Sequence, residues 1–368
     1  MEILRKSLRG VGLLSWEEGK RIDMSDNVVN LLWGENPIPI LDSVKNNIIL
    51  ELDKMNRYPC PMGYLVIDRI SKAIGFPAEN IVVDNGIDGI LNLLSRTIID
   101  PDNVVIITPP TFPVYASTAK LMGGNVREVK LENDFSLDFD KLMDAICENT
   151  KAIYIANPNN PTGNLLLTNR QIEEILKRFS GLLVIDECYY GICKSTAVDL
   201  VRKYDNLIIL RSFSKTLNLA GLRIGYAVGS EYLISAMKGI LVNCNPFVLD
   251  RLAQAGSVAI EYSDQLGDEF VLAREQFKQK LLTIEKIKVI DTETSFLVLD
   301  VFDTGGKASE IIVGMKELGV LIKDSRVYGM DDRYIRIGIP RKDLEDVVIE
   351  KLQLVMNDLY SRKCKVIL

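Results

Sequence analysis

Short runs of consecutive apolar residues recur through the first two thirds of the chain. They predict strands at 81–83, 104–107, 126–131, 152–156, 182–185, 207–210 and 224–228. These runs are apolar on both faces and alternate with helical segments, which is typical of a mostly parallel sheet sandwiched by helices. The predicted fold class is therefore α/β.

Segments with helical periodicity lie before the first of these strands and between the later ones. The clearest case is 64–74, where Leu65, Ile67, Ile70 and Ile74 are apolar. Two prolines and a glycine in 57–63 end the preceding helix. Helices in this region are expected at 41–55, 64–74, 90–98, after Tyr115, at 138–147 and at 168–179.

The pattern changes after residue 229. Helices are predicted at 230–243, 246–285, 307–318 and 342–361, and strands at 288–290, 295–300, 320–323 and 333–338. The smaller number of strands indicates a second, smaller α+β domain. We expect an N-terminal arm over 1–30, a large domain over 46–240, and a small domain formed by 31–45 together with 241–368.

Polar or glycine-rich segments follow the ends of several predicted strands. They are 85–89, 108–112, 157–164, 186–190 and 212–215. In open α/β sheets, ligands bind outside the carboxyl ends of the strands. The shared position of these segments predicts one site at one edge of the sheet.

Composition excludes several classes of protein. The 368 residues suffice for two domains, and 47% are hydrophobic. The net charge of -6, with scattered basic residues, disfavours nucleic acid as a partner. No apolar run approaches the ~20 residues of a membrane helix, and the first residues lack the apolar core of a signal peptide. We expect a cytoplasmic protein with no membrane partner.

The chain has six cysteines and no histidine. Six cysteines in a chain of this length do not indicate a disulfide framework, and a structural zinc site is not expected. Serine-type triads are also excluded. Acid–base work near neutral pH must therefore use lysine, tyrosine, cysteine or a carboxylate with a shifted pKa.

The polar segments contain the groups that a pyridine-aldehyde cofactor needs. Such a cofactor needs an amine, an acid for the ring nitrogen, donors for the ring hydroxyl, and a phosphate site. Lys215 is the candidate amine, with an ordinary surface lysine as the alternative. Asp186 ends a buried strand, so its charge needs a partner; a turn cap is its alternative.

The other candidates have structural alternatives as well. Tyr189 and Asn160 are candidate donors to the ring oxygen, or a core tyrosine and a turn asparagine. Phe112 is a candidate for stacking on the ring, or plain core. Candidates for holding phosphate are Ser212, Ser214, Arg223 and the N–H groups at Gly86, Ile87 and Asp88.

Taken together, these motifs carry a resemblance. The sequence resembles the fold-type I, pyridoxal-phosphate-dependent aminotransferases of classes I and II, and is most similar to the histidinol-phosphate aminotransferase branch. The resemblance covers roughly residues 30–355. Its motifs are Glu35-Asn36-Pro37, Tyr58-Pro59, Pro110-Thr111-Phe112 with Tyr115, the segment 157–163, Asp186-Glu187 with Tyr189, the segment 212–215, Gly221-Leu222-Arg223, and Arg336.

The resemblance implies roles for the cofactor half of the site. Pyridoxal phosphate would be bound by Lys215, which also moves the substrate proton, and its ring nitrogen would pair with Asp186. The resemblance places the remaining residues as follows: Asn160 and Tyr189 at the ring oxygen, Phe112 on the ring face, and Ser212, Ser214, Arg223 and the Gly86–Asp88 turn at the phosphate.

It also implies a dimer and a substrate contact. Tyr58 would reach the phosphate of the neighbouring subunit of a homodimer. Arg336 would bind the substrate carboxylate in a two-pronged fork. Lys323 stands where relatives acting on histidinol phosphate usually carry a second arginine, and a lysine is a point charge. Gly34, beside Trp33, stands where asparagine often occurs, and is the third candidate substrate residue, although a linker is its alternative.

One more departure concerns the phosphate site. After Gly86, relatives commonly have Ser or Ala followed by Asp-Glu, whereas this chain has Ile87-Asp88-Gly89. A hydroxyl is therefore missing, and we expect backbone N–H groups to bind the phosphate there.

Three functions remain open on the sequence. The first is an aminotransferase that moves an amino group between an amino acid, with histidinol phosphate or another anionic compound as substrate, and a 2-oxo acid in a ping-pong cycle. The second is an amino-acid decarboxylase resembling threonine-phosphate decarboxylase, which would release carbon dioxide. The third is a non-catalytic ligand-binding regulator domain, disfavoured because residues 1–30 are too short for a DNA-binding extension.

Overall fold

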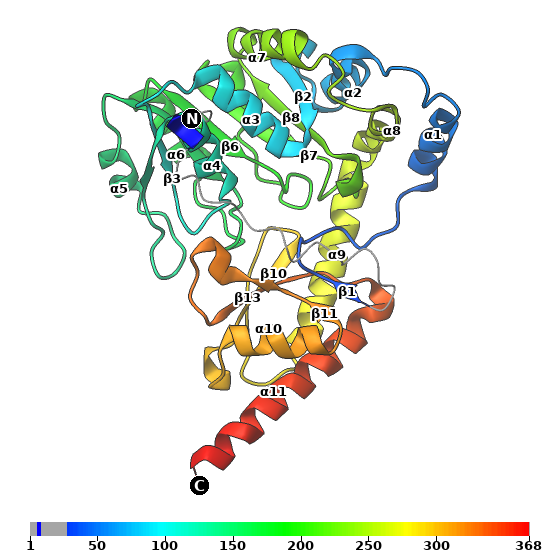
Figure 1. Cartoon of the computed structure of the whole chain (residues 1–368), viewed down its shortest axis with the longest axis vertical. Helices are drawn as coiled ribbons and strands as arrows, with labels where there is room; N and C mark the ends of the chain where they lie inside the picture. Colours follow the sequence, from blue (N-terminus) through cyan, green and yellow to red (C-terminus); the bar gives the residue numbers. More distant parts are fainter. Residues whose placement is uncertain (1–5, 9–27, 368) are drawn as a thin grey trace, which may run out of the picture.

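The chain forms two lobes joined by the long helix α9 (Ser263–Leu281) (Figure 1). This is a computed structural model, and it describes residues 6–8 and 28–367. The upper lobe in Figure 1 contains the large sheet. The lower lobe contains the smaller sheet and the C-terminal helix α11 (Glu345–Ile367).

The upper lobe contains a seven-stranded sheet in the order β2-β8-β7-β6-β5-β3-β4. Every pair is parallel except the two formed by β8, which is antiparallel to both neighbours. The predicted, mostly parallel sheet is confirmed. Its strands are β2 (Ile81–Asn85), β3 (Val104–Ile107), β4 (Asn125–Glu128), β5 (Thr150–Ala156), β6 (Leu182–Asp186), β7 (Leu207–Ser212) and β8 (Ile224–Gly229).

Helices cover this sheet because each presents an apolar face to it. In α3 (Gly86–Ile98) the buried side chains include Ile90, Leu91 and Leu94, and the helix packs on β2, β7 and β8. The start of α6 (Asn169–Arg178) is fixed by a capping box between Thr168 and Gln171. The other helices of this lobe are α1 (Asp42–Leu52), α2 (Tyr64–Ile74), α4 (Val114–Leu121), α5 (Phe139–Asp144), α7 (Glu231–Cys244) and α8 (Arg251–Gly256).

The lower lobe is an α+β unit, as predicted. A four-stranded antiparallel sheet has the order β12-β13-β10-β9, and a separate parallel pair joins β1 to β11. The strands are β1 (Val29–Asn30), β9 (Lys288–Ile290), β10 (Phe296–Asp300), β11 (Val320–Leu321), β12 (Lys323–Asp324) and β13 (Tyr334–Gly338). Helix α10 (Ala308–Glu317) packs against α11 beside these strands.

Three predicted elements differ from the structure. Helix α3 begins at Gly86, so the expected turn 86–89 is the first turn of a helix. The helix predicted at 246–285 begins later, at Arg251, because the Asp250 side chain caps the start of α8; it is then divided into α8, a 3-10 segment (Ser257–Tyr262) and α9. The strand predicted at 320–323 is two strands in two sheets, with buried Ile322 between them.

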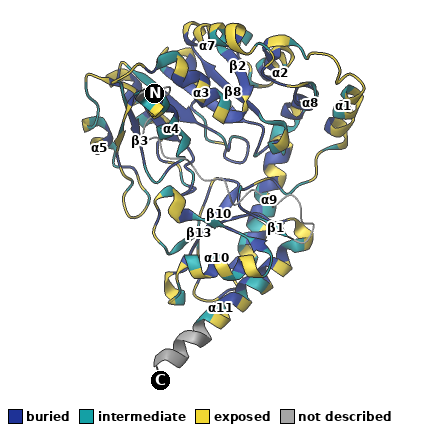
Figure 2. Cartoon of the chain, viewed as in Figure 1, coloured by how far each residue is buried: buried dark blue, intermediate teal, exposed yellow. Residues whose placement is uncertain are grey.

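Two large hydrophobic cores lie on the two sides of the interlobe region of the described chain (Figure 2), and a small third cluster of Tyr189, Phe296, Val298 and Met330 contains residues from both lobes. The core of the large sheet includes side chains as late as Leu266, whereas the second core is formed mainly by residues from Phe270 on and also takes in Leu31 and Ile192. The domain limits stay a prediction, and this packing favours a division inside α9. Most of the predicted arm, residues 1–30, lies outside the described residues, but its last two residues form β1.

Candidate active site

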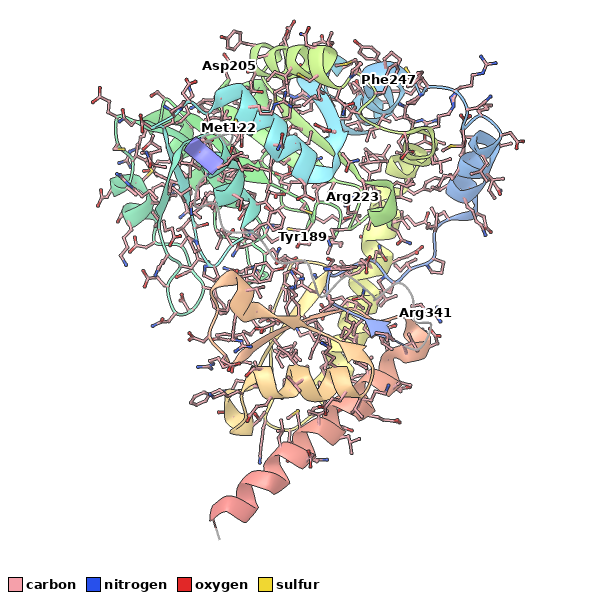
Figure 3. All side chains as sticks on the ribbon, in the orientation of Figure 1. Met122, Tyr189, Asp205, Arg223, Phe247 and Arg341 are labelled. Carbon is pink, nitrogen blue, oxygen red and sulfur yellow. The ribbon has the colours of Figure 1, made fainter. Side chains whose placement is uncertain are left out.

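The strand ends meet in a cavity of about 430 Å³ between the lobes. Because β2, β3, β5, β6 and β7 run the same way, their carboxyl ends share one edge; the reversed β8 brings the residue before it, Arg223, to that edge. Tyr189 and Arg223 both lie where the two lobes face each other (Figure 3). The predicted residues that line the cavity are Ile87, Asp88, Phe112, Asn160, Asp186, Tyr189, Ser212, Ser214, Lys215, Arg223 and Arg336.

Lys215 lies just beyond β7 and its amine is buried. Its Nζ donates to the carbonyl oxygen of Trp33 at 2.6 Å and to that of Gly34 at 3.4 Å. Burial lowers the pKa of Lys215, because the charged form loses solvation. The main chain is fixed by Asn36, whose amide donates to the carbonyls of Lys215 and Thr216, both at 3.2 Å.

Asp186 ends β6 with its carboxylate buried. The Tyr115 hydroxyl donates to one oxygen at 2.6 Å, and the Cys188 N–H donates to the other at 2.9 Å. Burial raises the pKa of Asp186 to about 6, and these two hydrogen bonds oppose the shift. A buried carboxylate held by two neutral donors suits a cationic partner such as a protonated ring nitrogen.

The first turn of α3 and Arg223, the residue before β8, lie side by side, where they could hold an anion. A helix N-terminus presents N–H groups without intrahelical partners. The Arg223 guanidinium lies 2.9 Å from the Asp88 carboxylate and 3.5 Å from the Ser214 hydroxyl. A Cβ on Gly86 would stand 2.6 Å from the Arg223 guanidinium, so glycine is needed for this approach.

Arg336, in β13, reaches the opposite side of the cavity. Its guanidinium donates to the Asn160 side-chain oxygen at 2.6 Å and to the Leu32 carbonyl. It is buried, and its carbon lies 4.8 Å from the ring centre of Phe296 and 5.3 Å from that of Tyr328. Its Nε is buried and has no hydrogen-bond partner among the described residues.

Four predicted site residues do not line the cavity. Gly86 lies behind Arg223, and Gly34 contributes its carbonyl. Lys323 in β12 lies directly opposite Arg336 in the neighbouring antiparallel strand β13. Tyr58 is 79% exposed and stacks on Phe247, with ring centroids 4.5 Å apart, at the surface of the upper lobe (Figure 3). Its predicted place in a neighbouring subunit stays a prediction.

Several residues that line the cavity have no predicted role from the sequence. Tyr115 lies three residues after Phe112, and the two rings touch edge to face; that spacing was the available signal. Cys188 follows the Asp186 motif directly, and Trp33 and Glu35 flank Gly34. Tyr328 ends a short 3-10 helix of the lower lobe (Ser325–Tyr328), and its sequence carries no signal for the site.

Comparison with known proteins now defines the class. The family model described as aminotransferase class I and II matches residues 22–350, so the chain belongs to that family. The predictions of family, fold type I, enzyme class and pyridoxal phosphate as cofactor are confirmed. An amino acid and a 2-oxo acid are the substrates that this family implies.

Two of the similar proteins are both named histidinol-phosphate aminotransferase. The chain is 32% identical to the histidinol-phosphate aminotransferase of Methanococcus aeolicus, over 90% of this chain and 91% of that protein. It is 31% identical to the enzyme of the same name from Thermoanaerobacter pseudethanolicus, over 87% of this chain and 90% of that one.

Solved structures agree on the fold. Histidinol-phosphate aminotransferase from Sinorhizobium meliloti, in complex with pyridoxal-5'-phosphate, covers 98% of this chain and 99% of its own, with a TM-score of 0.85 and 22% identity. L-threonine-O-3-phosphate decarboxylase from Porphyromonas gingivalis covers 90% of this chain and 100% of its own, with a TM-score of 0.76 and 22% identity.

The residues of the cavity fit the cofactor. A buried amine of lowered pKa, a buried carboxylate with neutral partners, and a helix N-terminus with an arginine lie around one space. These match an aldehyde, a ring nitrogen and a phosphate.

Among the helices of the described residues, none has both the length and the apolar character of a membrane span.

Proposed function

We propose that this chain transfers the amino group of an anionic amino compound, with histidinol phosphate as the first candidate, to a 2-oxo acid in a ping-pong cycle. The observation that carries the proposal is one cavity that holds the Lys215 amine, the Asp186 carboxylate and the Arg336 guanidinium. The relatives named histidinol-phosphate aminotransferase support the choice of first substrate.

When bound, pyridoxal phosphate would supply an electron sink for the bonds of the substrate's α-carbon. Lys215 Nζ is the proposed base that accepts the proton from that carbon and later donates it again. Its lowered pKa raises the fraction of neutral amine, and only the neutral amine accepts a proton. Lys215 Nζ donates to the Trp33 carbonyl at 2.6 Å, and this hydrogen bond orients the amine.

The remaining residues would hold the cofactor. Asp186 would hold the ring nitrogen's proton, and Phe112 would lie against the ring face. Asn160 and Tyr189 would serve the ring oxygen; Tyr189 is buried and burial raises its pKa, so its hydroxyl keeps a proton to donate. The phosphate would be held by Ser212, Ser214, Arg223 and the N–H groups of Ile87 and Asp88 in the first turn of α3. The predicted Gly86 N–H is already used, because it donates to the Arg223 carbonyl at 2.7 Å.

Arg336 is the proposed anion contact of the substrate. Lys323 faces it across the antiparallel strands, and directly opposed residues point to the same side of a sheet. Arg336 lines the cavity and Lys323 does not. We therefore propose that Arg336 binds any substrate anion and that Lys323 adds a second charge only for a phosphate.

The test is a half-reaction screen. The cofactor-loaded enzyme is mixed with histidinol phosphate, with histidine, glutamate and aspartate, and with threonine phosphate, and the cofactor spectrum, oxo product and carbon dioxide are measured. Transfer predicts amination of the cofactor and an oxo product. Carbon dioxide release would instead identify a decarboxylase, and a panel with no spectral change would contradict transfer.

Two variants test the anion contacts. Arg336→Lys should raise KM for every anionic substrate by about tenfold or more, because a point charge replaces a fork. Lys323→Ala should raise KM for phosphate substrates alone. If Lys323→Ala affects carboxylate and phosphate substrates equally, the proposed division between the two residues is wrong.

We further propose a homodimer, with the cytoplasm as its predicted location. Around Tyr58 the surface exposes large apolar side chains from α1, the loop after it and the start of α2. Large apolar side chains exposed together along one stretch of the chain are typical of a protein interface. The exposed residues are Ile49, Leu50, Leu52, Met55, Tyr58, Tyr64 and Leu65.

A further inference from the structure

The long helix α9 touches the main chain of the upper lobe at a glycine. A Cβ on Gly267 would stand 2.2 Å from the carbonyl oxygen of Gly191 and 2.7 Å from its carbonyl carbon. Main-chain atoms in a packed interior have no room to move aside, so only glycine permits this approach. Gly267 is buried within the helix and its φ lies outside the left-handed region. The close contact, rather than the backbone conformation, therefore requires glycine here.

Gly191 belongs to a tight turn, residues 189–193, that begins at the cavity. The Cys193 N–H donates to the Tyr189 carbonyl at 2.9 Å, and the Gly191 N–H donates to the Cys193 carbonyl at 3.1 Å. These two bonds make the turn one compact unit, and Tyr189 at its start lines the cavity. A change in the position of Gly191 therefore also changes the position of Tyr189.

The turn also contacts Thr216, the residue after Lys215. The Thr216 hydroxyl donates to the Tyr190 carbonyl at 2.5 Å. A Cβ on Gly191, whose φ is +98°, would stand 2.5 Å from the Thr216 Cγ2 methyl. Thr216 is 1% exposed, so both contacts lie in the interior. Through Gly191 and Thr216, α9 is in contact with the segment that carries Lys215.

Ion pairs also join the end of this turn to α9, but they contribute less. Lys194 lies 3.2 Å from the carboxylate of Asp264 and 3.2 Å from that of Asp268. All three side chains are more than half exposed, and exposed ion pairs add little because water and salt screen them. The buried glycine contact is therefore the one that fixes the position of the turn.

We infer that Gly267 is a positioning residue, which holds Lys215 and Tyr189 in place through its close contact with the turn. The inference rests on the proposed function, in which Lys215 binds the cofactor and Tyr189 serves its ring oxygen. Gly267→Ala would displace the turn, because Gly191 has close neighbours both on α9 and at Thr216. Groups of an active site that move by a fraction of an ångström lose much of their effect.

The first readout is the absorbance of the bound cofactor against pH, which needs no turnover. The absorption band changes when the nitrogen that links pyridoxal phosphate to the lysine loses its proton, and the groups around the cofactor set the midpoint of that change. Gly267→Ala should move the midpoint by about half a pH unit or more, because a hydrogen bond to the cofactor is misplaced.

Gly239→Ala is the matched control and should leave the midpoint unchanged. Gly239 lies within helix α7 and is exposed, and among the described residues nothing lies within 4 Å of a Cβ placed there. The two variants therefore make the same change inside a helix, and only Gly267→Ala meets main-chain atoms.

The second readout is the half-reaction with an amino donor, followed over a single turnover. Gly267→Ala should lower its rate constant about tenfold or more. The dissociation constant of the donor should change little, because the proposed anion contact is Arg336, which lies in β13 and not in the turn. A weaker donor with an unchanged rate constant would overturn the inference, because the methyl group would then act on substrate binding.

A second pair of variants keeps the inference testable if Gly267→Ala does not fold. Thr216→Val keeps the shape of the side chain but loses the hydroxyl that donates to the Tyr190 carbonyl, so the midpoint should move as well. Thr216→Ser keeps that hydroxyl and should give a smaller change.

An unchanged midpoint in Gly267→Ala or in Thr216→Val, or an equal change in Gly239→Ala, would overturn the inference. Failure of the proposed function shows separately in the unmodified protein. Its cofactor absorbance would then be the same as that of Lys215→Ala, and no amino donor would give an oxo product.

Discussion

The hydroxyl of Tyr115 donates a hydrogen bond to the carboxylate of Asp186 at 2.6 Å, and both side chains are buried. A donor to the charged form of an acid lowers its pKa, so this bond opposes the effect of burial. Tyr115 therefore keeps Asp186 charged in a place where an isolated carboxylate would take up a proton.

Tyr115→Phe should raise the pKa of Asp186 further, by roughly one unit, because a hydrogen bond to a charged group is lost. The readout is the pH dependence of the free energy of unfolding of the cofactor-free protein. Tyr154→Phe is the matched control, since Tyr154 stacks on Tyr115 at 5.6 Å between ring centroids and leaves the Tyr115–Asp186 bond in place. A larger shift in the control than in Tyr115→Phe would contradict this role.

Asp186→Asn should remove the pH dependence that the Asp186 carboxyl gives to the free energy of unfolding of the cofactor-free protein. Burial raises the pKa of Asp186 to about 6, above its ordinary value of about 3.9, so the folded protein binds the proton more tightly than the unfolded chain does. The stability of the cofactor-free protein therefore falls as pH rises from about 4 to about 6, by about 3 kcal/mol.

At pH 8, cofactor-free Asp186→Asn should be more stable than the unmodified protein by up to about 3 kcal/mol, while turnover of the loaded enzyme is lost. The amide keeps the local geometry, because its oxygen can accept from the Cys188 N–H and its nitrogen can donate to the Tyr115 hydroxyl. Urea unfolding at pH 4 and pH 8 checks this. Equal stability of the two proteins at pH 8 would show that the buried charge costs nothing.

Gly86→Ala tests the phosphate site, and Gly75→Ala is its control. Both glycines have φ of +68°, so alanine should cost about 1–2 kcal/mol of stability at either position. Only at Gly86 would the new methyl group meet a side chain, at 2.6 Å from the Arg223 guanidinium, whereas nothing lies within 4 Å at Gly75. Cofactor affinity should fall about tenfold in Gly86→Ala alone. Equal losses of cofactor affinity in both variants would show that the position of the Arg223 guanidinium does not affect cofactor binding.

Mixing two inactive variants tests the dimer. If Tyr58 completes the site of the neighbouring subunit, a hybrid of Lys215→Ala and Tyr58→Ala subunits has one site with both defects and one intact site. Equal mixing with subunit exchange should then restore about one quarter of the unmodified activity. Activity no greater than the sum of the two separate variants would place Tyr58 in its own subunit's site, or outside any site.

The cofactor half of the site was accessible from sequence because each group follows a strand, and the strand direction alone brings them together. Asp186 and Lys215 are examples: parallel β6 and β7 place both at one edge of the sheet. Arg223 reached that edge for a different reason, the reversal of β8, which the apolar pattern did not predict.

The substrate half was less accessible because it depends on how the lobes meet. Tyr328 ends a short 3-10 helix that the apolar pattern did not predict, and the sequence around Trp33 resembles a linker, although the lower lobe fixes its neighbour Gly34. The apolar run at 320–323 predicts one strand, but in the structure the chain passes from one sheet to another within this run. Lys323 therefore lies opposite Arg336 and does not line the cavity. Long-range packing, rather than local periodicity, decides these positions.

Borohydride reduction of the cofactor-loaded enzyme shows whether Lys215 binds pyridoxal phosphate. Reduction fixes pyridoxal phosphate to the lysine that holds it, and peptide mass spectrometry then locates the added mass. We predict the label on the peptide that contains Lys215, and no label in Lys215→Ala. A label on a different lysine of the unmodified protein, or an undiminished label in Lys215→Ala, would contradict the account.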